Sequence, residues 1–208
     1  MKIIIAGDLG SLTWVNNTDD AFHSKERYLV FVASAEDFAL HLDADCFIDM
    51  GFDGRFFSPV EKPLLINETI KTIDQIVGAP PLLARFCGWP GFCERPVWEI
   101  ATRSNDSSWI SPIMNAINKR YELVSDEPGF VAPRIVAMII NEAFFALEEK
   151  ISSPTEIDMA MKLGTNYPEG PLTWAKQIGT KHIYQLLLEL SKKSDRYDPH
   201  PDLKTTYP

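Results

Sequence analysis

A glycine turn follows the first apolar run of the chain, where the sequence reads MKIIIAGDLG. Dinucleotide-binding folds use G-x-G-x-x-G at this place, because glycines allow the tight turn, the close approach of the backbone to the pyrophosphate and the packing of helix on strand. Only the second and third glycines are matched, by Gly7 and Gly10, and Asp8 brings a negative charge close to the expected pyrophosphate. Gly7 and Gly10 are therefore candidate NAD-binding residues, and a glycine turn that binds no nucleotide is the alternative.

Three further polar residues interrupt apolar segments. Asn67 and Thr69 follow the run LLI, and Glu99 lies within VWEI. Asparagine or threonine before an amphipathic helix is a common N-cap. A single glutamate in an apolar strand is consistent with an edge strand whose carboxylate faces water. Structural roles are thus available for all three residues, beside any role in chemistry.

The cysteines Cys46, Cys87 and Cys93 are odd in number and lack C-x-x-C spacing. This argues against a disulfide framework and against a structural zinc site. We expect buried free thiols, with a Cys87–Cys93 pair as the alternative, and no metal.

The composition predicts a globular protein. The chain has 208 residues, is 45% hydrophobic, and carries 29 acidic against 20 basic residues, a net charge of −9. That charge is unlike the basic footprint of a nucleic-acid binder. The N-terminal apolar run is too short for a signal peptide, and no apolar run is long enough to span a membrane. We therefore expect a cytoplasmic protein with neither nucleic acid nor membrane as a partner.

The first half alternates between strand and helix patterns. Short β-branched or aromatic runs predict strands over Lys2–Ala6, Tyr28–Ala33 and Cys46–Met50. Helical spacing predicts helices over Asp37–Leu42 and Thr69–Val77. This alternation is typical of an α/β domain with a parallel sheet.

From residue 129 onward the pattern is helical. Apolar residues cover most of the first helix of this region, from Ile135 to Leu147, so it must be buried. Ser153 to Glu156 forms a capping box that predicts a helix over 154–163, with Gly164 as its C-cap. Pro171 begins another helix that ends at Gly179, and a last one, with its apolar stripe from Ile183 to Leu190, ends at Lys192 and Lys193.

The segment from Pro128 to Lys204 resembles the C-terminal helical domain of the 3-hydroxyacyl-CoA dehydrogenases. The resemblance rests on PGF before a long helix, NEA within it, a Ser-Pro start to the next helix, YPEGP followed by Ile-Gly, and the closing DPHPDLK. It implies a shortened Rossmann-like domain over residues 1–127 and an all-α dimerisation domain over 128–208. Because that family dimerises through this domain, a homodimer through the C-terminal helices is expected.

The resemblance also implies positions for the active site. Arg85, Phe86 and Gly88 match the family stretch Arg-Phe-x-Gly-x-His, which places Pro90 where the family has the histidine that takes the proton from the 3-hydroxyl as hydride passes to NAD. Glu99 corresponds to the glutamate that orients this histidine.

In the same comparison, Asn67 matches a family asparagine and Thr69 falls on a serine that helps to hold the 3-oxygen of the substrate. The family asparagine after PGF is replaced by Pro133. The long helical hairpin that helps to hold CoA is missing, which puts acyl-CoA recognition in doubt.

Two interpretations follow. In the first, the protein is an NAD-dependent oxidoreductase of fatty acid metabolism that acts on 3-hydroxyacyl-CoA with reduced or lost activity. In the second, it is a pseudoenzyme, a non-catalytic homodimeric binding or interaction protein derived from that family. A small-molecule pocket for a ligand other than CoA in the aromatic-rich region around Trp89 is a third and weaker alternative.

Overall fold

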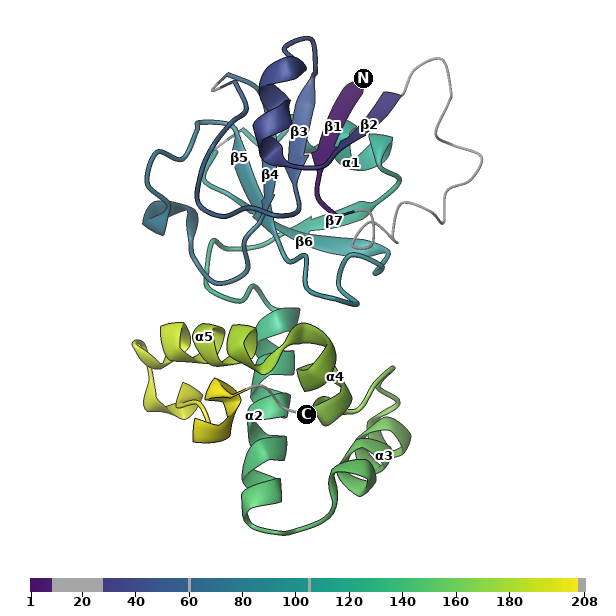
Figure 1. Cartoon of the computed structure of the whole chain (residues 1–208), viewed down its shortest axis with the longest axis vertical. Coiled ribbons are helices and arrows are strands. Elements are labelled where there is room, and N and C mark those ends of the chain that lie inside the picture. Colours follow the sequence, from purple (N-terminus) through teal and green to yellow (C-terminus); the bar gives the residue numbers. More distant parts are fainter. Residues whose placement is uncertain (9–27, 60, 105, 206–208) are drawn as a thin grey trace. The chain divides into compact units, whose positions relative to one another are not determined.

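The structure is a computed structural model that describes residues 1–8, 28–59, 61–104 and 106–205 (Figure 1). It divides into two compact units, Met1–Phe130 and Val131–Pro208. The first unit contains a seven-stranded sheet among its described residues, in the order β2-β1-β3-β4-β5-β6-β7. The strands are β1 Lys2–Ala6, β2 Tyr28–Val32, β3 Cys46–Asp49, β4 Leu64–Asn67, β5 Leu83–Phe86, β6 Val97–Thr102 and β7 Arg120–Leu123.

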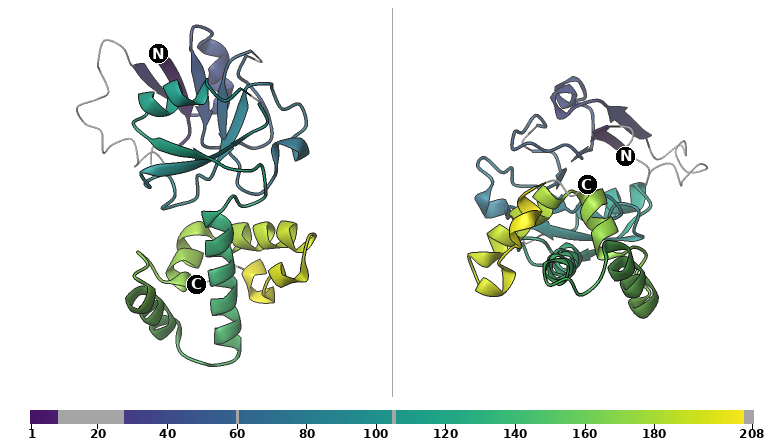
Figure 2. Two further views of the ribbon diagram at one scale, coloured as in Figure 1. Left: turned by 180° about the vertical axis from the view of Figure 1, so that it is seen from behind. Right: turned by 60° about the horizontal axis from the view of Figure 1, so that its bottom comes forward.

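Strands β2 to β5 are parallel, as the sequence predicts, whereas β6 runs antiparallel to β5 and parallel to β7. Helix α1, Ile110–Ala116, packs on one face of the sheet, seen in front in the left view of Figure 2. The opposite face is covered by two 3₁₀ turns, η3 Ala35–Leu40 and η4 Ile73–Gln75, through the side chains of Phe38 and Ile73.

The two helices predicted in this half form as 3₁₀ helices with other bounds. The helix predicted over Asp37–Leu42 forms two residues earlier as η3, and only Ile73–Gln75 of the segment Thr69–Val77 is helical. With so few residues between β2 and β3, this short 3₁₀ helix is enough to bury Phe38 against Phe47 of β3, whose ring centroid lies 4.7 Å away. No helical hairpin lies between these two strands, since the described residues 33–45 contain only η3.

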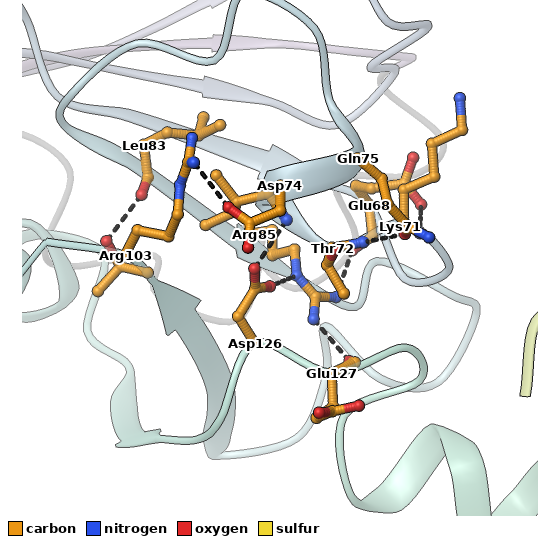
Figure 3. Close-up of polar contacts among 12 residues, drawn as sticks. Glu68, Lys71, Thr72, Asp74, Gln75, Leu83, Arg85, Arg103, Asp126 and Glu127 are labelled. Carbon is orange, nitrogen blue, oxygen red and sulfur yellow. Dashed lines mark hydrogen bonds and ion pairs between the residues drawn. The ribbon is translucent and has the colours of Figure 1, made fainter. Parts of the chain in front are cut away.

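Arg85 organises the end of the first unit (Figure 3). Its side chain is fully buried and forms an ion pair with Asp126, while its Nη1 and Nη2 donate to the backbone oxygens of Glu68 at 3.3 Å and Glu127 at 2.6 Å. The guanidinium also stacks 4.2 Å from the ring centroid of Phe130. One buried cation therefore fixes the PGF turn against the sheet.

The second unit consists of α2 Ala132–Glu148, α3 Pro154–Thr165, α4 Pro171–Ile178 and α5 Thr180–Ser191, followed by the 3₁₀ turns η5 Asp195–Tyr197 and η6 Pro201–Lys204. Helices α4 and α5 pack on α2, and α3 packs on α4. The capping box at Ser153 and the helix ends at Pro171 and Gly179 are confirmed. Gly164 is not the C-cap of α3, because the helix continues to Asn166, which adopts left-handed angles (φ 58°).

Two of the sequence motifs in this unit bind each other. Asn141, from NEA, is buried in α2; its Oδ1 accepts from the backbone N of His200 at 2.7 Å and its Nδ2 donates to Asp198 O at 2.9 Å. The ring of His200 is 2% exposed and packs edge-on against Phe145 at 4.7 Å. The DPH motif therefore joins the segment after α5 to α2 within the helical unit. No helix in the described part of the chain is both long and apolar enough to cross a membrane.

Candidate functional site

The first group of candidate residues lies where β4 and β5 end. Thr69 is 4% exposed, and its Oγ1 has no hydrogen-bond partner of normal geometry among the described residues. The thiol of Cys87 lies close enough for a weak interaction with this hydroxyl. Since sulfur is a poor hydrogen-bonding partner, the hydroxyl is left poorly satisfied. The backbone oxygen of Thr69 is held firmly by Gly129 N at 2.8 Å, within the turn that Arg85 fixes.

Glu99 lies in the same neighbourhood. Burial raises the pKa of the Cys87 thiol to about 12, its contact with Thr69 opposes this, and the negative charge of Glu99 adds to the rise. Cys87 is therefore a neutral thiol and a poor nucleophile. The structure thus brings Thr69 and Glu99, two of the predicted site residues, to the surroundings of one buried cysteine. All three cysteines are buried and free, which confirms the sequence expectation.

Asn67 has a structural task. Its Nδ2 donates to Met50 O at 3.0 Å, and its Oδ1 accepts from Gly88 N at 2.7 Å. A Cβ on Gly88 would lie 2.5 Å from Asn67 Cγ, so only glycine allows this approach. Asn67 therefore ties together the ends of β3 and β5. Its predicted contact with substrate remains a prediction.

The simple structural interpretations of Asn67, Thr69 and Glu99 are wrong. Neither Asn67 nor Thr69 caps a helix, because Thr72 precedes the 3₁₀ turn η4, in which Gln75 Oε1 accepts from Thr72 N at 2.8 Å. Glu99 is not on an edge strand, because β6 pairs with β5 on one side and with β7 on the other. Sequence alone could not reveal β7, whose RYEL segment lacks a clear apolar alternation.

Trp98 and Glu99 point to opposite faces of β6, since successive residues of a strand alternate. The Trp98 ring stacks on Phe86 at 4.6 Å and its Nε1 donates to Cys93 O at 3.1 Å, within the core under α1. It therefore does not occupy the Glu99 side of the strand. Trp89 is also buried, with its ring edge-on to Phe92 at 6.1 Å.

Pro90 is exposed in the loop after β5. It has no ionisable group and, as proline, no backbone N–H to donate. The loop thus offers no proton acceptor at the position where the resemblance would place a histidine. Pro133 is buried at the start of α2, where proline suits the first helical turn.

A second group lies where β1 and β3 meet. Strand β1 has β2 on one side and β3 on the other, so the chain turns in opposite directions at this point, where open α/β sheets bind ligands. A cavity of about 200 Å³ opens there. Its lining includes Gly7 and five charged residues, namely Asp8, Glu36, Asp49, Asp53 and Arg55. Gly10, the other predicted cofactor-binding residue, lies outside the described residues.

Asp49 is the buried member of this group, with an exposed fraction of 4%. Burial raises the pKa of its carboxyl to about 6, against the effect of a hydrogen bond in which Oδ1 accepts from Gly51 N at 3.0 Å. Sequence reasoning missed Asp49 and Glu36, although an acidic residue ending the strand beside the glycine turn was a usable signal.

This cavity fits part of a dinucleotide and not the whole. The carboxylate of Glu36, just beyond the end of β2, is of the type that accepts from a ribose hydroxyl in nucleotide-binding folds. Asp8, Asp49 and Asp53 would instead repel a pyrophosphate. The guanidinium of Arg55 is already bound to Asp53, through Nη2 at 2.6 Å and Nε at 2.9 Å. The described residues therefore do not fit NAD as a complete group.

The fold, a Rossmann-like sheet followed by a helical unit, is that of the 3-hydroxyacyl-CoA dehydrogenases among the structural neighbours of the chain. Residues 129–207 match the family described as 3-hydroxyacyl-CoA dehydrogenase, C-terminal domain. Residues 129–207 are thus a C-terminal domain of the 3-hydroxyacyl-CoA dehydrogenase family, and the chain as a whole is similar to members of that family.

Several relatives are similar to this chain. The 3-hydroxyadipyl-CoA dehydrogenase of Escherichia coli is 47% identical over 78 residues, which cover 36% of this chain and 16% of the relative. The 3-hydroxybutyryl-CoA dehydrogenase of Clostridioides difficile is 27% identical over 199 residues, which cover 91% of this chain and 69% of the relative. The chain thus spans only a sixth of the first relative and about two thirds of the second.

Solved structures show the fold. The (S)-3-hydroxybutyryl-CoA dehydrogenase PaaH1 of Ralstonia eutropha aligns with a TM-score of 0.71 at 18% identity, over 98% of this chain and 92% of that chain. FadB2 of M. tuberculosis aligns with a TM-score of 0.72 at 15% identity, over 97% and 91% of the respective chains. At these identities the similarity concerns the fold alone.

Proposed function

We propose that this protein is a 3-hydroxyacyl-CoA dehydrogenase in which the NAD-dependent oxidation of a 3-hydroxyacyl-CoA is strongly reduced or lost. The observation that carries the proposal is the exposed Pro90 in the loop after β5, while Thr69 and Glu99 lie around Cys87. The chain retains groups that would orient a substrate oxygen, and it has a proline at the position of the group that would accept the proton of that oxygen.

The chemistry follows from these residues. The poorly satisfied hydroxyl of Thr69 can donate to the 3-oxygen of a substrate and so hold it in place. Without a base at Pro90, the proton of the 3-hydroxyl has no acceptor in this loop, and such help is worth roughly 10²- to 10⁴-fold in rate. The short 3₁₀ helix between β2 and β3 and the absence of an amide at Pro133 weaken substrate binding further.

The direct test is turnover of acetoacetyl-CoA with NADH, followed by loss of the reduced-nicotinamide absorbance. We expect a kcat/KM at least about 10²-fold below that of the C. difficile 3-hydroxybutyryl-CoA dehydrogenase assayed in parallel. Residual activity should fall in Glu99→Gln and stay unchanged in Glu122→Gln, because Glu122 pairs with Glu99 on β7 but lies exposed. Activity within tenfold of the relative would contradict the proposal.

A second candidate function is that of a non-catalytic homodimeric binding protein, and the surface of α3 favours it. Helix α3, which is described throughout, buries none of its residues. Met159 and Leu163 are 56% and 81% exposed, and their i, i+4 spacing places them on one face. A groove of about 580 Å³ lies between α3 and α4 and includes both residues in its lining. We propose that a second copy of the chain covers this face.

Substitution of Leu163 tests the dimer. We expect the wild-type protein to elute as a dimer in light-scattering chromatography at micromolar concentration, and Leu163→Glu to shift it to a monomer without loss of helical signal. Leu188→Glu is the matched control, because Leu188 is an exposed leucine on α5 (46%) outside the groove. A monomeric wild-type protein would exclude this proposal.

A further inference from the structure

We propose that β7 is an interaction surface at which two copies of the chain pair edge to edge, in antiparallel orientation, about Tyr121. The proposal goes beyond the proposed function and does not rest on it, because β7 lies in the first unit and the groove beside α3 in the second. Three features support it, namely the open edge of β7, the charges of its residues, and the carboxylate of Glu99 on the neighbouring strand.

The open edge of β7 has backbone groups available for pairing. The strand ends the sheet, with β6 on one side and no strand on the other among the described residues. Val124 N, just after β7, donates to Ile100 O of β6 at 3.0 Å. Since the backbone groups of successive residues alternate in direction along a strand, those of Tyr121 and Leu123 point away from β6. A further strand could therefore bind there.

The sequence of β7, Arg120-Tyr121-Glu122-Leu123, is self-complementary in charge. In an antiparallel pair centred on Tyr121, Arg120 of each copy lies directly opposite Glu122 of the other. Both residues are exposed, and neither forms an ion pair within the described part of the chain. The two Tyr121 residues would exchange backbone hydrogen bonds, which makes the flanking Arg120–Glu122 pairs the closely spaced type.

The carboxylate of Glu99 makes this pairing more favourable. Glu99 on β6 lies opposite Glu122 on β7 in the parallel register, and like charges in this position are unfavourable. A second copy would bring its Arg120 to the other side of Glu122, on the same face of the sheet. Glu122 would then lie between a carboxylate and a guanidinium, so pairing offsets the repulsion within one copy.

The other face of β7 is apolar. Tyr121 is half-buried and packs on the core under α1, whereas Leu123, on the same face, is 48% exposed. Pairing about Tyr121 would bring the two tyrosines side by side. Two four-residue strands make a small contact compared with a standard interface, so we expect a weak association with a Kd of roughly 0.1–1 mM.

The experiment follows self-association of the full chain by sedimentation velocity from about 10 μM to about 1 mM, a range that spans the expected Kd. The Leu163→Glu variant serves as the parent, because it carries the substitution expected to break the contact through α3. Association through β7 doubles the mass of whichever species predominates at low concentration. High salt should weaken this association, because it screens exposed charges.

Two variants are expected to repel themselves and to attract each other. Arg120→Glu leaves two acidic residues on β7 and Glu122→Arg leaves two basic ones, so each variant alone places like charges opposite and should not associate. Mixed in equal amounts, the two variants place every acidic residue opposite a basic one, and association should return. Arg196→Glu is the control with the same change in charge, because Arg196 is exposed on η5, in the second unit.

Amide exchange locates the contact. The N–H of Tyr121 should exchange more slowly as the protein concentration rises, because it donates to the second copy. The N–H of Val124 is the internal control, since it already donates to Ile100 O and should not respond to concentration. Circular dichroism of each variant shows whether its fold is preserved.

The outcomes are distinct from those of the earlier tests. A chain that does not associate at about 1 mM would overturn the proposal, and so would Arg120→Glu and Glu122→Arg variants that each associate like the parent. Association without slower exchange at Tyr121 would place the contact elsewhere and also overturn it. Rapid turnover of acetoacetyl-CoA, or a monomeric wild type at micromolar concentration, would refute the proposed functions instead.

Discussion

The Arg85→Lys variant will lose about 1–3 kcal/mol of unfolding free energy in urea denaturation, the usual cost of leaving a buried hydrogen-bonding group unsatisfied. The guanidinium binds Asp126 and the backbone oxygens of Glu68 and Glu127 at once, and it also stacks on Phe130. A lysine presents a single charged nitrogen and cannot reproduce this fork. Amide exchange of Gly129, whose N–H donates to Thr69 O, should become faster in the same variant.

The matched control is Arg103→Lys, which lies nearby in Figure 3. Arg103 pairs with Asp74 at 2.7 Å, but its side chain is 49% exposed and that of Asp74 is 75% exposed. Surface pairs of this kind contribute about 0–1 kcal/mol, so the control should unfold close to wild type. If Arg85→Lys lies within 1 kcal/mol of wild type, the structural role assigned to Arg85 is wrong.

The Asp49→Asn variant will be more stable than wild type at pH 7.5 by up to about 3 kcal/mol, and the difference will vanish near pH 4. Burial raises the pKa of the Asp49 carboxyl to about 6 in the folded protein, above its ordinary value of 3.8. Between these two values the folded state binds more protons than the unfolded state. Stability therefore falls as the pH rises from about 4 to about 6, and the full cost remains above that window.

Thermal unfolding of wild type and Asp49→Asn across pH 4 to 8 measures this difference in stability. The amide keeps the acceptor that Gly51 N requires, so the fold should be preserved. Asp53→Asn is a control for which the opposite change in stability is expected. The hydrogen bond from Arg55 lowers the pKa of the exposed Asp53 carboxyl, so its ionised form stabilises the folded state. Equal stability of wild type and Asp49→Asn at pH 7.5 would refute the assigned burial cost.

Burial of Asp49 carries a wider implication. A fold gains nothing in stability from an ionised carboxylate that is only 4% exposed. Strongly shifted carboxyls of this kind are frequent at ligand sites. The burial that makes ionised Asp49 costly to the folded state therefore also marks it as a candidate ligand-binding residue, and Asp49→Asn is expected to remove the stability cost.

Much of the local structure could be predicted from the sequence. Strands β1, β2 and β3 were predicted within a residue of their ends, because each is a short β-branched or aromatic run with polar neighbours. The capping box at Ser153 and the proline at the start of α4 also predicted where their helices begin, because these residues favour a helix start in the backbone next to them. The helices predicted between the strands differ in type and bounds, because the few residues between the strands leave room only for short 3₁₀ helices.

The candidate site could likewise be predicted from the sequence only in part. Residue types alone determined that Pro90 supplies no base, that the glycine turn at Gly7 is incomplete, and that the chain resembles the 3-hydroxyacyl-CoA dehydrogenases. Only the tertiary structure decided that Arg85 holds the PGF turn, that Thr69 and Glu99 lie around Cys87, and that Asp49 and Glu36 line one cavity. The reason is physical, because side-chain identity is a local property, whereas burial and the pairing of distant charges depend on which strands become neighbours in the sheet.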